Sequence, residues 1–135
     1  MTRFVDTNVF LRLLAGDDAE QSPASRRLFE RATARKERLA TSSLVVAELV
    51  WTLESYFELD RKAVREKIEL LLNTPGIKVE HSDWIQEAIS FYEEKNVDYV
   101  DAYNAVFSRE LGLDAVYSWD RDFDRLPGIT RLEPP

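Results

Sequence analysis

Short apolar segments that alternate with longer helical segments constrain the fold more than any other feature of this sequence. The apolar segments are Phe4-Val5, Leu39-Ala40, Ile77-Val79, Ala115-Tyr117 and Thr130-Leu132. The periodicity between them predicts helices over residues 9–14, 22–35, 44–57, 60–72, 83–94 and 99–111. This alternation is typical of a parallel sheet whose strands are joined by right-handed helical crossovers. We therefore predict an α/β fold with helices on both faces of a short, mostly parallel sheet.

Capping residues predict where several helices begin. Ser22 stands before Pro23, which is typical of an N-cap followed by the first helical residue. The hydroxyls of residues 41–43 and the carboxylate of Asp60 are placed to cap the next two helices. In parallel α/β sheets, ligands bind outside the carboxyl ends of the strands. Residues that follow the strands are therefore the first candidates for a functional site.

Composition excludes several classes of protein and of metal site. The 135 residues, 44% of them hydrophobic and 32% charged, suit one globular domain over residues 1–135. No apolar run is long enough to cross a membrane. The N-terminus reaches Asp6 before an apolar stretch forms, so we expect no secretory signal and a cytoplasmic protein. With no cysteine and one histidine, any metal must be held mainly by oxygen.

The charge of the chain is unevenly distributed. The net charge is −7, which argues against a protein that coats nucleic acid by bulk electrostatics. Residues 26–38 nevertheless hold six basic and two acidic side chains, whereas residues 98–124 hold seven acidic and two basic ones. A basic helix is usually a solvated surface, but on an acidic protein it also suits phosphate contact. We predict RNA-binding roles for Arg26, Arg27, Arg31 and Arg35.

Four carboxylates occupy positions that suit one shared site. Asp6 and Asp120 each follow a strand, so both should project from the carboxyl edge of the sheet. Glu48 is the only polar residue in its apolar run, which predicts a carboxylate on a largely buried helix that needs a partner, a proton or a cation. Asp101 shares a polar stripe with Asn104 on an otherwise apolar helix. These placements predict an acidic cluster.

Each carboxylate also has a purely structural interpretation. Asp6 and Asp98 could cap the helices that follow them, and Asp101 could be favoured by the helix dipole. Asp120 and Asp122 could belong to a solvated acidic turn, and Glu48 could pair with an arginine. Taken together, these interpretations require four separate segments to place acids at one sheet edge by chance, so we favour a functional cluster.

A cluster of carboxylates without cysteine or histidine ligands suits hard cations, Mg²⁺ or Mn²⁺, rather than zinc or copper. Carboxylates at such short distances from one another cannot all stay ionised without a cation. A metal at such a site lowers the pKa of bound water and stabilises charge on the attacking and leaving oxygens of a phosphodiester. The cluster therefore predicts phosphodiester hydrolysis without a protein nucleophile, and leaves open whether one ion or two are bound.

Four segments resemble, in order and over nearly the whole chain, the acidic motifs of PIN-domain ribonucleases. They are Phe4-Val5-Asp6-Thr7-Asn8, Val45-Val46-Ala47-Glu48-Leu49, Asp98-Tyr99-Val100-Asp101-Ala102 and Ser118-Trp119-Asp120-Arg121-Asp122-Phe123. The length of the chain and the order of the motifs are similar to those of the VapC toxins of toxin–antitoxin pairs. The resemblance implies a three-layer, Rossmann-like α/β/α sandwich and a Mg²⁺- or Mn²⁺-dependent endoribonuclease. It also implies a homodimer and neutralisation by a VapB-like antitoxin.

The resemblance also implies a role for each matching residue. The positions that match metal-coordinating acids are Asp6, Glu48, Asp101 and Asp120. The positions that match supporting residues are Thr7, Asn8, Asp98, Asn104 and Asp122.

Two other functions remain as alternatives. A phosphatase of the haloacid-dehalogenase type also begins with a strand and an aspartate, but it needs a second aspartate where this chain has Asn8. A non-catalytic PIN-like module would only dock RNA or a partner, and the presence of all four acids argues against it.

The helices predicted over residues 44–72 hold more apolar residues than one inner face requires. This surplus predicts a groove between them for an amphipathic antitoxin segment, although part of it could serve a homodimer interface.

Overall fold

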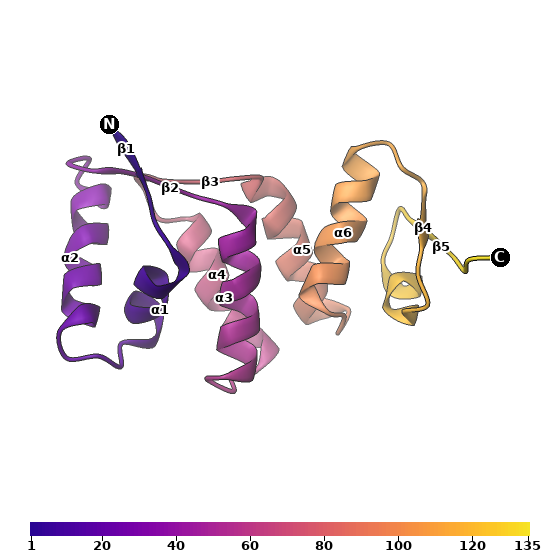
Figure 1. Ribbon diagram of the computed structural model, residues 1–135, viewed down its shortest axis with the longest axis horizontal. Coiled ribbons are helices and arrows are strands. Elements are labelled where there is room, and N and C mark those ends of the chain that lie inside the picture. The colour runs from indigo at the N-terminus through magenta and orange to yellow at the C-terminus, as the bar shows by residue number, and fades with distance from the viewer. The chain divides into compact units, whose positions relative to one another are not determined.

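The computed structural model describes residues 1–135 and divides into two compact units, Met1–Ser82 and Asp83–Pro135 (Figure 1). The elements of the first unit are β1 (Thr2–Phe4), α1 (Thr7–Ala15), α2 (Gln21–Thr33), β2 (Arg38–Thr41), α3 (Ser43–Ser55), α4 (Arg61–Leu72) and β3 (Ile77–Val79). Those that follow are α5 (Ser82–Glu94), α6 (Tyr99–Glu110), β4 (Ala115–Tyr117), the 3₁₀ helix η1 (Arg121–Arg125) and β5 (Thr130–Leu132). No helix combines the length and the apolar character that a membrane span requires.

The first unit is built on a three-stranded parallel sheet in the order β1-β2-β3. Beyond the end of β1, the Val5 amide donates to the Ala40 carbonyl at 2.9 Å, and the buried Thr41 hydroxyl donates to the Val5 carbonyl at 2.9 Å. These two bonds fix the carboxyl end of β1 immediately before Asp6. The fully buried side chains of Val46, Leu49, Leu53, Val64 and Ile68 come from α3 and α4 and form much of the core.

The helices α1 and α2 pack through aromatic side chains. Phe10 of α1 is fully buried and stacks on Phe29 of α2, with ring centroids 5.3 Å apart. An offset aromatic pair of this kind adds about 0.5–1.5 kcal/mol beyond the burial of its area. The pair therefore holds the N-terminal helix that follows Asp6 against its neighbour.

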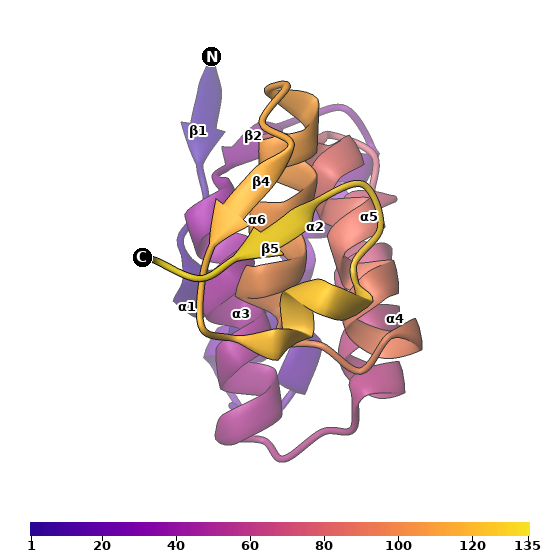
Figure 2. The same ribbon diagram turned by 90° about the vertical axis from the view of Figure 1, so that its right-hand side faces the viewer.

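The second unit combines α5 and α6 with a two-stranded parallel sheet of β4 and β5, which lie side by side in Figure 2. Side chains join the two helices: Tyr92 contacts Tyr99 edge to face with centroids 6.5 Å apart, and Trp84 contacts Phe107 at 5.8 Å. Arg109 of α6 also donates to Glu87 of α5 at 2.8 Å. These contacts hold α6 against α5 at both ends, and the contact of Tyr99 holds the first turn of α6, which carries Asp101.

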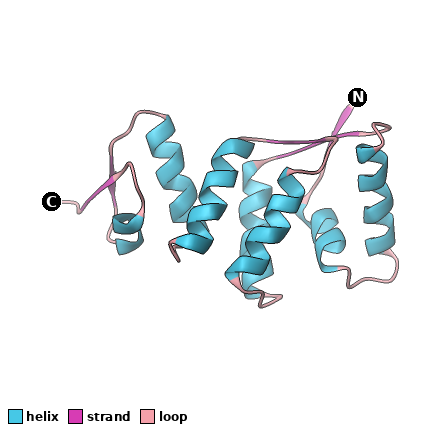
Figure 3. Ribbon diagram, turned by 180° about the vertical axis from the view of Figure 1, so that it is seen from behind, coloured by secondary structure: helices cyan, strands magenta, loops and turns pink.

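The strands confirm the α/β class. All five predicted strands are present, every pair is parallel, and the strands are short relative to the helices (Figure 3). Two predicted caps are confirmed: Ser42 accepts from the Val45 amide at 3.2 Å, and Asp60 accepts from the Ala63 amide at 2.8 Å.

The predicted cap at Ser22 is wrong. The helix α2 begins earlier, at Gln21, and Ser22 lies inside it. The Asp18 carboxylate accepts from the Gln21 amide at 2.6 Å and from the Glu20 amide at 2.9 Å, and these bonds lower the pKa of Asp18. A carboxylate satisfies two free amides at once, so Asp18 takes the capping role that the sequence pattern gives to Ser22.

Candidate metal centre

Three carboxylates meet in the second unit. One oxygen each of Asp101, Asp120 and Asp122 lies within 4.8 Å of the others. Asp101 comes from the first turn of α6, and the other two flank the start of η1, which follows β4. The structure therefore brings together two of the four predicted metal ligands and one predicted supporting acid.

Local hydrogen bonds place Asp120. Its backbone amide donates to the Ser118 hydroxyl at 2.9 Å, and its own Oδ1 accepts from the Asp122 amide at 2.9 Å. Asp120 is thus the side-chain cap of η1. The structural interpretation of Asp120 as a turn residue is correct as far as it goes, but the same carboxylate also faces Asp101.

Asp122 is held from two sides. The Arg125 guanidinium donates to Oδ1 of Asp122, and the backbone amide of Asp98 donates to Oδ2 at 3.0 Å. Asp98 stands at the N-cap position of α6, but its side chain makes no capping bond. The structural interpretation of Asp98 as a side-chain cap therefore does not hold, and its amide instead ties the start of α6 to η1.

The electrostatics of the cluster centre on Asp101. Burial, followed by contact with the Asp120 carboxylate and the charges of Asp98 and Asp122, raises the pKa of Asp101 to about 7. The hydrogen bond from the Asp122 amide and the contact with Asp101 lower the pKa of Asp120. Asp101 therefore resists ionisation, whereas the neighbouring Asp120 ionises readily. This difference is expected of acids that share one site.

The donor set fits a divalent cation. Oδ2 of Asp101 is buried and has no hydrogen-bond partner, which is unusual for a polar atom inside a protein. Carboxylate oxygens are the ligands that Mg²⁺ and Mn²⁺ prefer, and a cation there would both satisfy this oxygen and relieve the repulsion. The residues present therefore fit the metal that the sequence predicts.

Asp6 and Glu48 lie in the first unit, and each has a free carboxylate. Asp6 stands at the N-cap position of α1, but its side chain makes no capping bond. Glu48 is exposed, which contradicts the prediction that it is buried. The prediction failed because Leu44 and Trp51, one turn on either side of Glu48, are 81% and 67% exposed, so α3 keeps an apolar outer face around it.

The polar residues expected to support the site differ in their surroundings. Thr7 is buried at the first position of α1, whereas Asn104 is exposed one turn after Asp101 on α6. Asn8 is exposed and lines a hollow of about 370 Å³ between α1 and α2, together with Arg12 and Gln21. Two residues that the sequence reasoning missed are Ser118 and Arg125, which orient Asp120 and Asp122. The spacing of Arg125 three residues after Asp122 was the available signal.

The four basic residues predicted to contact RNA separate into different surroundings in the first unit. Arg26 lines an apolar cavity of about 630 Å³, whereas Arg31 and Arg35 line a basic hollow of about 450 Å³. Arg27 and Arg31 line a further hollow of about 420 Å³. The basic segment is therefore not one uniform helix face.

Comparison with known proteins gives consistent findings. The sequence profile of the PIN domain matches residues 3–129. A VapC ribonuclease of Aquifex aeolicus (strain VF5) is 30% identical over 132 residues, which cover 98% of this chain and 96% of that protein.

Two solved structures are also similar along the whole chain. VapC20 of Mycobacterium tuberculosis, a toxin that cleaves the sarcin-ricin loop, is 22% identical with a TM-score of 0.42 and 98% and 99% of the two chains covered. VapBC2 of Rickettsia felis, solved bound to a promoter DNA fragment, is 16% identical with a TM-score of 0.41 and 98% of each chain covered.

Proposed function

The chain belongs to the PIN-domain family and is of the VapC ribonuclease type within it, and from this premise we propose that it is a metal-dependent endoribonuclease. The observation that carries the proposal is the cluster of Asp101, Asp120 and Asp122, with its buried, unpartnered Asp101 oxygen. A phosphatase of the haloacid-dehalogenase type is a different family, so the match to the PIN-domain profile removes that alternative.

We propose that Asp6, Glu48, Asp101 and Asp120 are the metal-binding carboxylates of the enzyme and that residues 1–135 form one nuclease domain. Asp6 and Glu48 are the carboxylates of the first unit that match the family motifs, and neither is engaged in a cap or ion pair. Carboxylates from four segments give the charge that Mg²⁺ or Mn²⁺ needs when it also binds an anionic substrate.

A bound Mg²⁺ or Mn²⁺ would supply an activated water and stabilise charge on the reacting phosphate. The residues of the chain have the complementary tasks. Asp101, whose pKa is raised to about 7, would be one of the residues that hold the cation, because a cation would remove the cost of its ionised form. Ser118 and Arg125 keep Asp120 and Asp122 in place, and Thr7, Asn8, Asp98 and Asn104 are proposed as polar supports.

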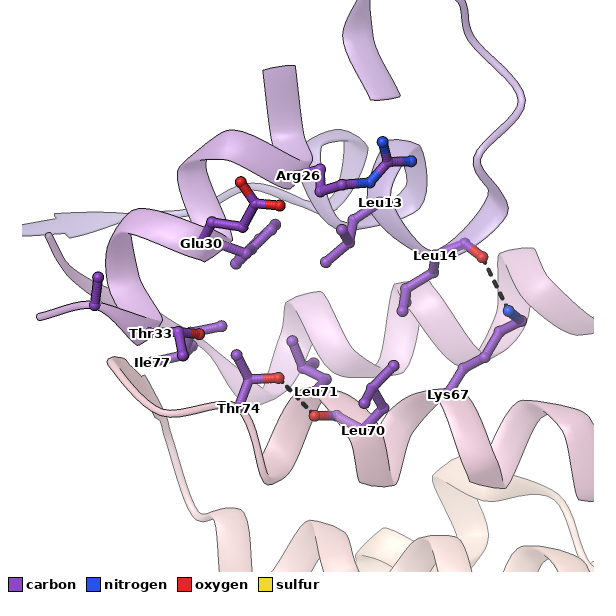
Figure 4. Close-up of a pocket in the computed structure, with 12 residues that line it drawn as sticks. Leu13, Leu14, Arg26, Glu30, Thr33, Lys67, Leu70, Leu71, Thr74 and Ile77 are labelled. Carbon is purple, nitrogen blue, oxygen red and sulfur yellow. Dashed lines mark hydrogen bonds between the residues drawn. The ribbon is translucent and has the colours of Figure 1, made fainter. Parts of the chain in front are cut away.

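We also propose that the protein is the toxin of a type II toxin–antitoxin pair and acts in the cytoplasm as a homodimer. The partner would be a VapB-like antitoxin that docks in the apolar cavity between α1, α2 and α4 (Figure 4). Leu14, Phe29, Leu70 and Leu71 line this cavity, and Leu70 is 62% exposed. Arg26 lies at its margin, so an amphipathic helix with acidic residues beside its apolar face fits the cavity.

The experiment that tests the nuclease is cleavage of a mixed RNA substrate with Mg²⁺, with Mn²⁺ and with EDTA. Cleavage should require the metal. Asp6→Asn, Glu48→Gln and Asp101→Asn should each reduce the rate by roughly 100-fold or more, because a lost ligand removes several kcal/mol of charge stabilisation. Asp114→Asn is the matched control, since Asp114 is exposed and outside the cluster.

Two results would contradict the proposal. Undiminished cleavage in EDTA would exclude metal dependence. Metal binding without any RNA cleavage would favour the alternative of a non-catalytic PIN-like module.

A further inference from the structure

A hollow of about 450 Å³ in the first unit is lined almost entirely by charged side chains. Its lining residues are Met1, Arg3, Arg31, Arg35, Lys36, Glu37 and Arg38, which we call the basic hollow. It lies where β1 and β2 begin and α2 has just ended. The basic hollow therefore holds five cations and one carboxylate on a chain whose net charge is −7.

Backbone pairing and one ion-pair network fix these cations. Parallel pairing sets Arg3 beside Leu39 and Thr2 beside Arg38, so Arg3 and Arg38 lie one position apart where β1 and β2 begin, and both line the basic hollow. Glu37 contacts Arg3 at 3.4 Å and Arg31 at 3.6 Å. Since one carboxylate cannot neutralise five cations, the basic hollow keeps an excess of positive charge.

The turn after α2 is also held in one conformation. Arg35 has a left-handed φ of 61°, and its amide donates to the Ala32 carbonyl at 3.0 Å. The Lys36 amide donates to the Arg31 carbonyl at 2.9 Å. These bonds close the end of the helix, as αL caps do. The cations of the turn are thus presented by ordered backbone and not by a loose loop.

The chemistry of the lining favours phosphate groups over bases. Four of its five cations are arginines, whose planar guanidinium groups bind phosphate oxygens in pairs. No aromatic side chain lines the basic hollow, so it offers no platform on which an exposed base could stack. Such a surface binds the backbone of RNA without reading its sequence.

We propose that the basic hollow is an exosite for the phosphate backbone of RNA, at the end of β1 opposite to Asp6. The chain from Arg3 to Asp6 is extended, so the two Cα atoms are about 10 Å apart. One RNA molecule can span that separation and contact both ends of the strand. This inference rests on the proposed ribonuclease function and adds a second contact, at the other end of β1 from Asp6, that holds the substrate.

The test compares two double variants with equal loss of charge. Arg31→Gln with Arg38→Gln removes two cations from the basic hollow, and Lys62→Gln with Lys95→Gln removes two exposed cations elsewhere. Binding of a fluorescent RNA hairpin is measured by anisotropy in EDTA, where no cleavage occurs, over a range of salt concentrations. Circular dichroism confirms that both variants fold.

The hollow variant should bind RNA at least about 10-fold more weakly at low salt. The slope of log K against log salt should become shallower by about 1.5, because two phosphate contacts are lost. The lysine variant should keep the slope of the unsubstituted protein. Equal losses of RNA affinity in both variants would mean that only the long-range electrostatic field of the protein acts on RNA, and would overturn the exosite.

Two further measurements separate this inference from the function on which it rests. If the unsubstituted protein cleaves RNA with Mn²⁺ while the hollow variant keeps the full salt slope, the exosite is wrong and the nuclease stands. If RNA is neither bound nor cleaved, both are wrong. If the hollow variant loses binding to a polyglutamate peptide but not to RNA, the basic hollow serves an acidic protein segment and the exosite is wrong.

Discussion

Replacement of Asp101 with asparagine should stabilise the metal-free protein above neutral pH. Burial and the neighbouring carboxylates raise the pKa of Asp101 from 3.8 to about 7. The folded protein therefore binds this proton more tightly than the unfolded chain does. Between these two pKa values the free energy of unfolding falls as the pH rises, and above pH 7 the full penalty is present.

The size of the effect follows from the same difference. If the whole pKa difference were converted into free energy, the ionised Asp101 would destabilise the folded protein by about 4 kcal/mol at pH 8. Asp101 is only partly buried, so solvent screens its neighbours, and we expect a penalty of about 1–2 kcal/mol. Asp101→Asn removes the ionisable group, and its amide can donate to the Asp120 carboxylate. The variant should gain about 1–2 kcal/mol at pH 8 and almost nothing at pH 4.

Urea unfolding in EDTA, followed by circular dichroism at pH 4 and pH 8, measures this difference. Asp114→Asn is the control, because it removes the same charge outside the cluster. Addition of Mn²⁺ at pH 8 should stabilise the unsubstituted protein and leave Asp101→Asn nearly unchanged. The reasoning is refuted if the variant and the unsubstituted protein show the same difference in stability between the two pH values.

Two other predictions concern the first unit. Gly76→Ala should destabilise the fold by about 2–4 kcal/mol in urea unfolding, because Gly76 has a φ of 87° and an added Cβ would lie 2.3 Å from the Ala32 carbonyl oxygen. Gly16→Ala, at a φ of 64° with open space around the added Cβ, should destabilise the fold by only about 1 kcal/mol. Equal losses of stability in the two variants would contradict the clash of residue 76 with Ala32. Leu70→Glu should leave the RNA cleavage rate unchanged but weaken co-purification with the antitoxin at least about 10-fold, because Leu70 is 62% exposed in the apolar cavity; retained binding would exclude this cavity as the antitoxin site.

The sequence predicted the elements well wherever the signal was local. Ser42 and Asp60 cap their helices as expected, because an N-cap needs only a side-chain oxygen beside free amides of the next turn. Ser22 misled because Asp18, four residues earlier, accepts from the amides of Glu20 and Gln21, and the helix begins at Gln21, before Ser22. The 3₁₀ helix η1 was missed because Asp-rich segments suit an open turn equally well, and only the bond to Asp120 selects the helix.

The candidate site was predicted less completely than the elements. Asp101, Asp120 and Asp122 could be found because a polar stripe and a strand end point to the same edge. The burial of Glu48 could not be predicted, since apolar neighbours indicate a buried helix only when another element covers them. The antitoxin groove predicted within residues 44–72 stays a prediction. The docking site that we propose, the cavity between α1, α2 and α4, depends on packing across distant segments that no local pattern records.

The hydrogen bonds within the acidic cluster also bear on which cation can bind there. Oδ1 of Asp120 accepts from the Asp122 amide, and both oxygens of Asp122 accept from other groups, Arg125 and the Asp98 amide. Asp120 and Asp122 are therefore poorly placed to coordinate an ion with both oxygens of one carboxylate. Ca²⁺ favours about six to eight oxygens, often from such bidentate carboxylates, whereas Mg²⁺ keeps much of its water and needs few protein ligands. We therefore expect the cluster to bind Mg²⁺ in preference to Ca²⁺.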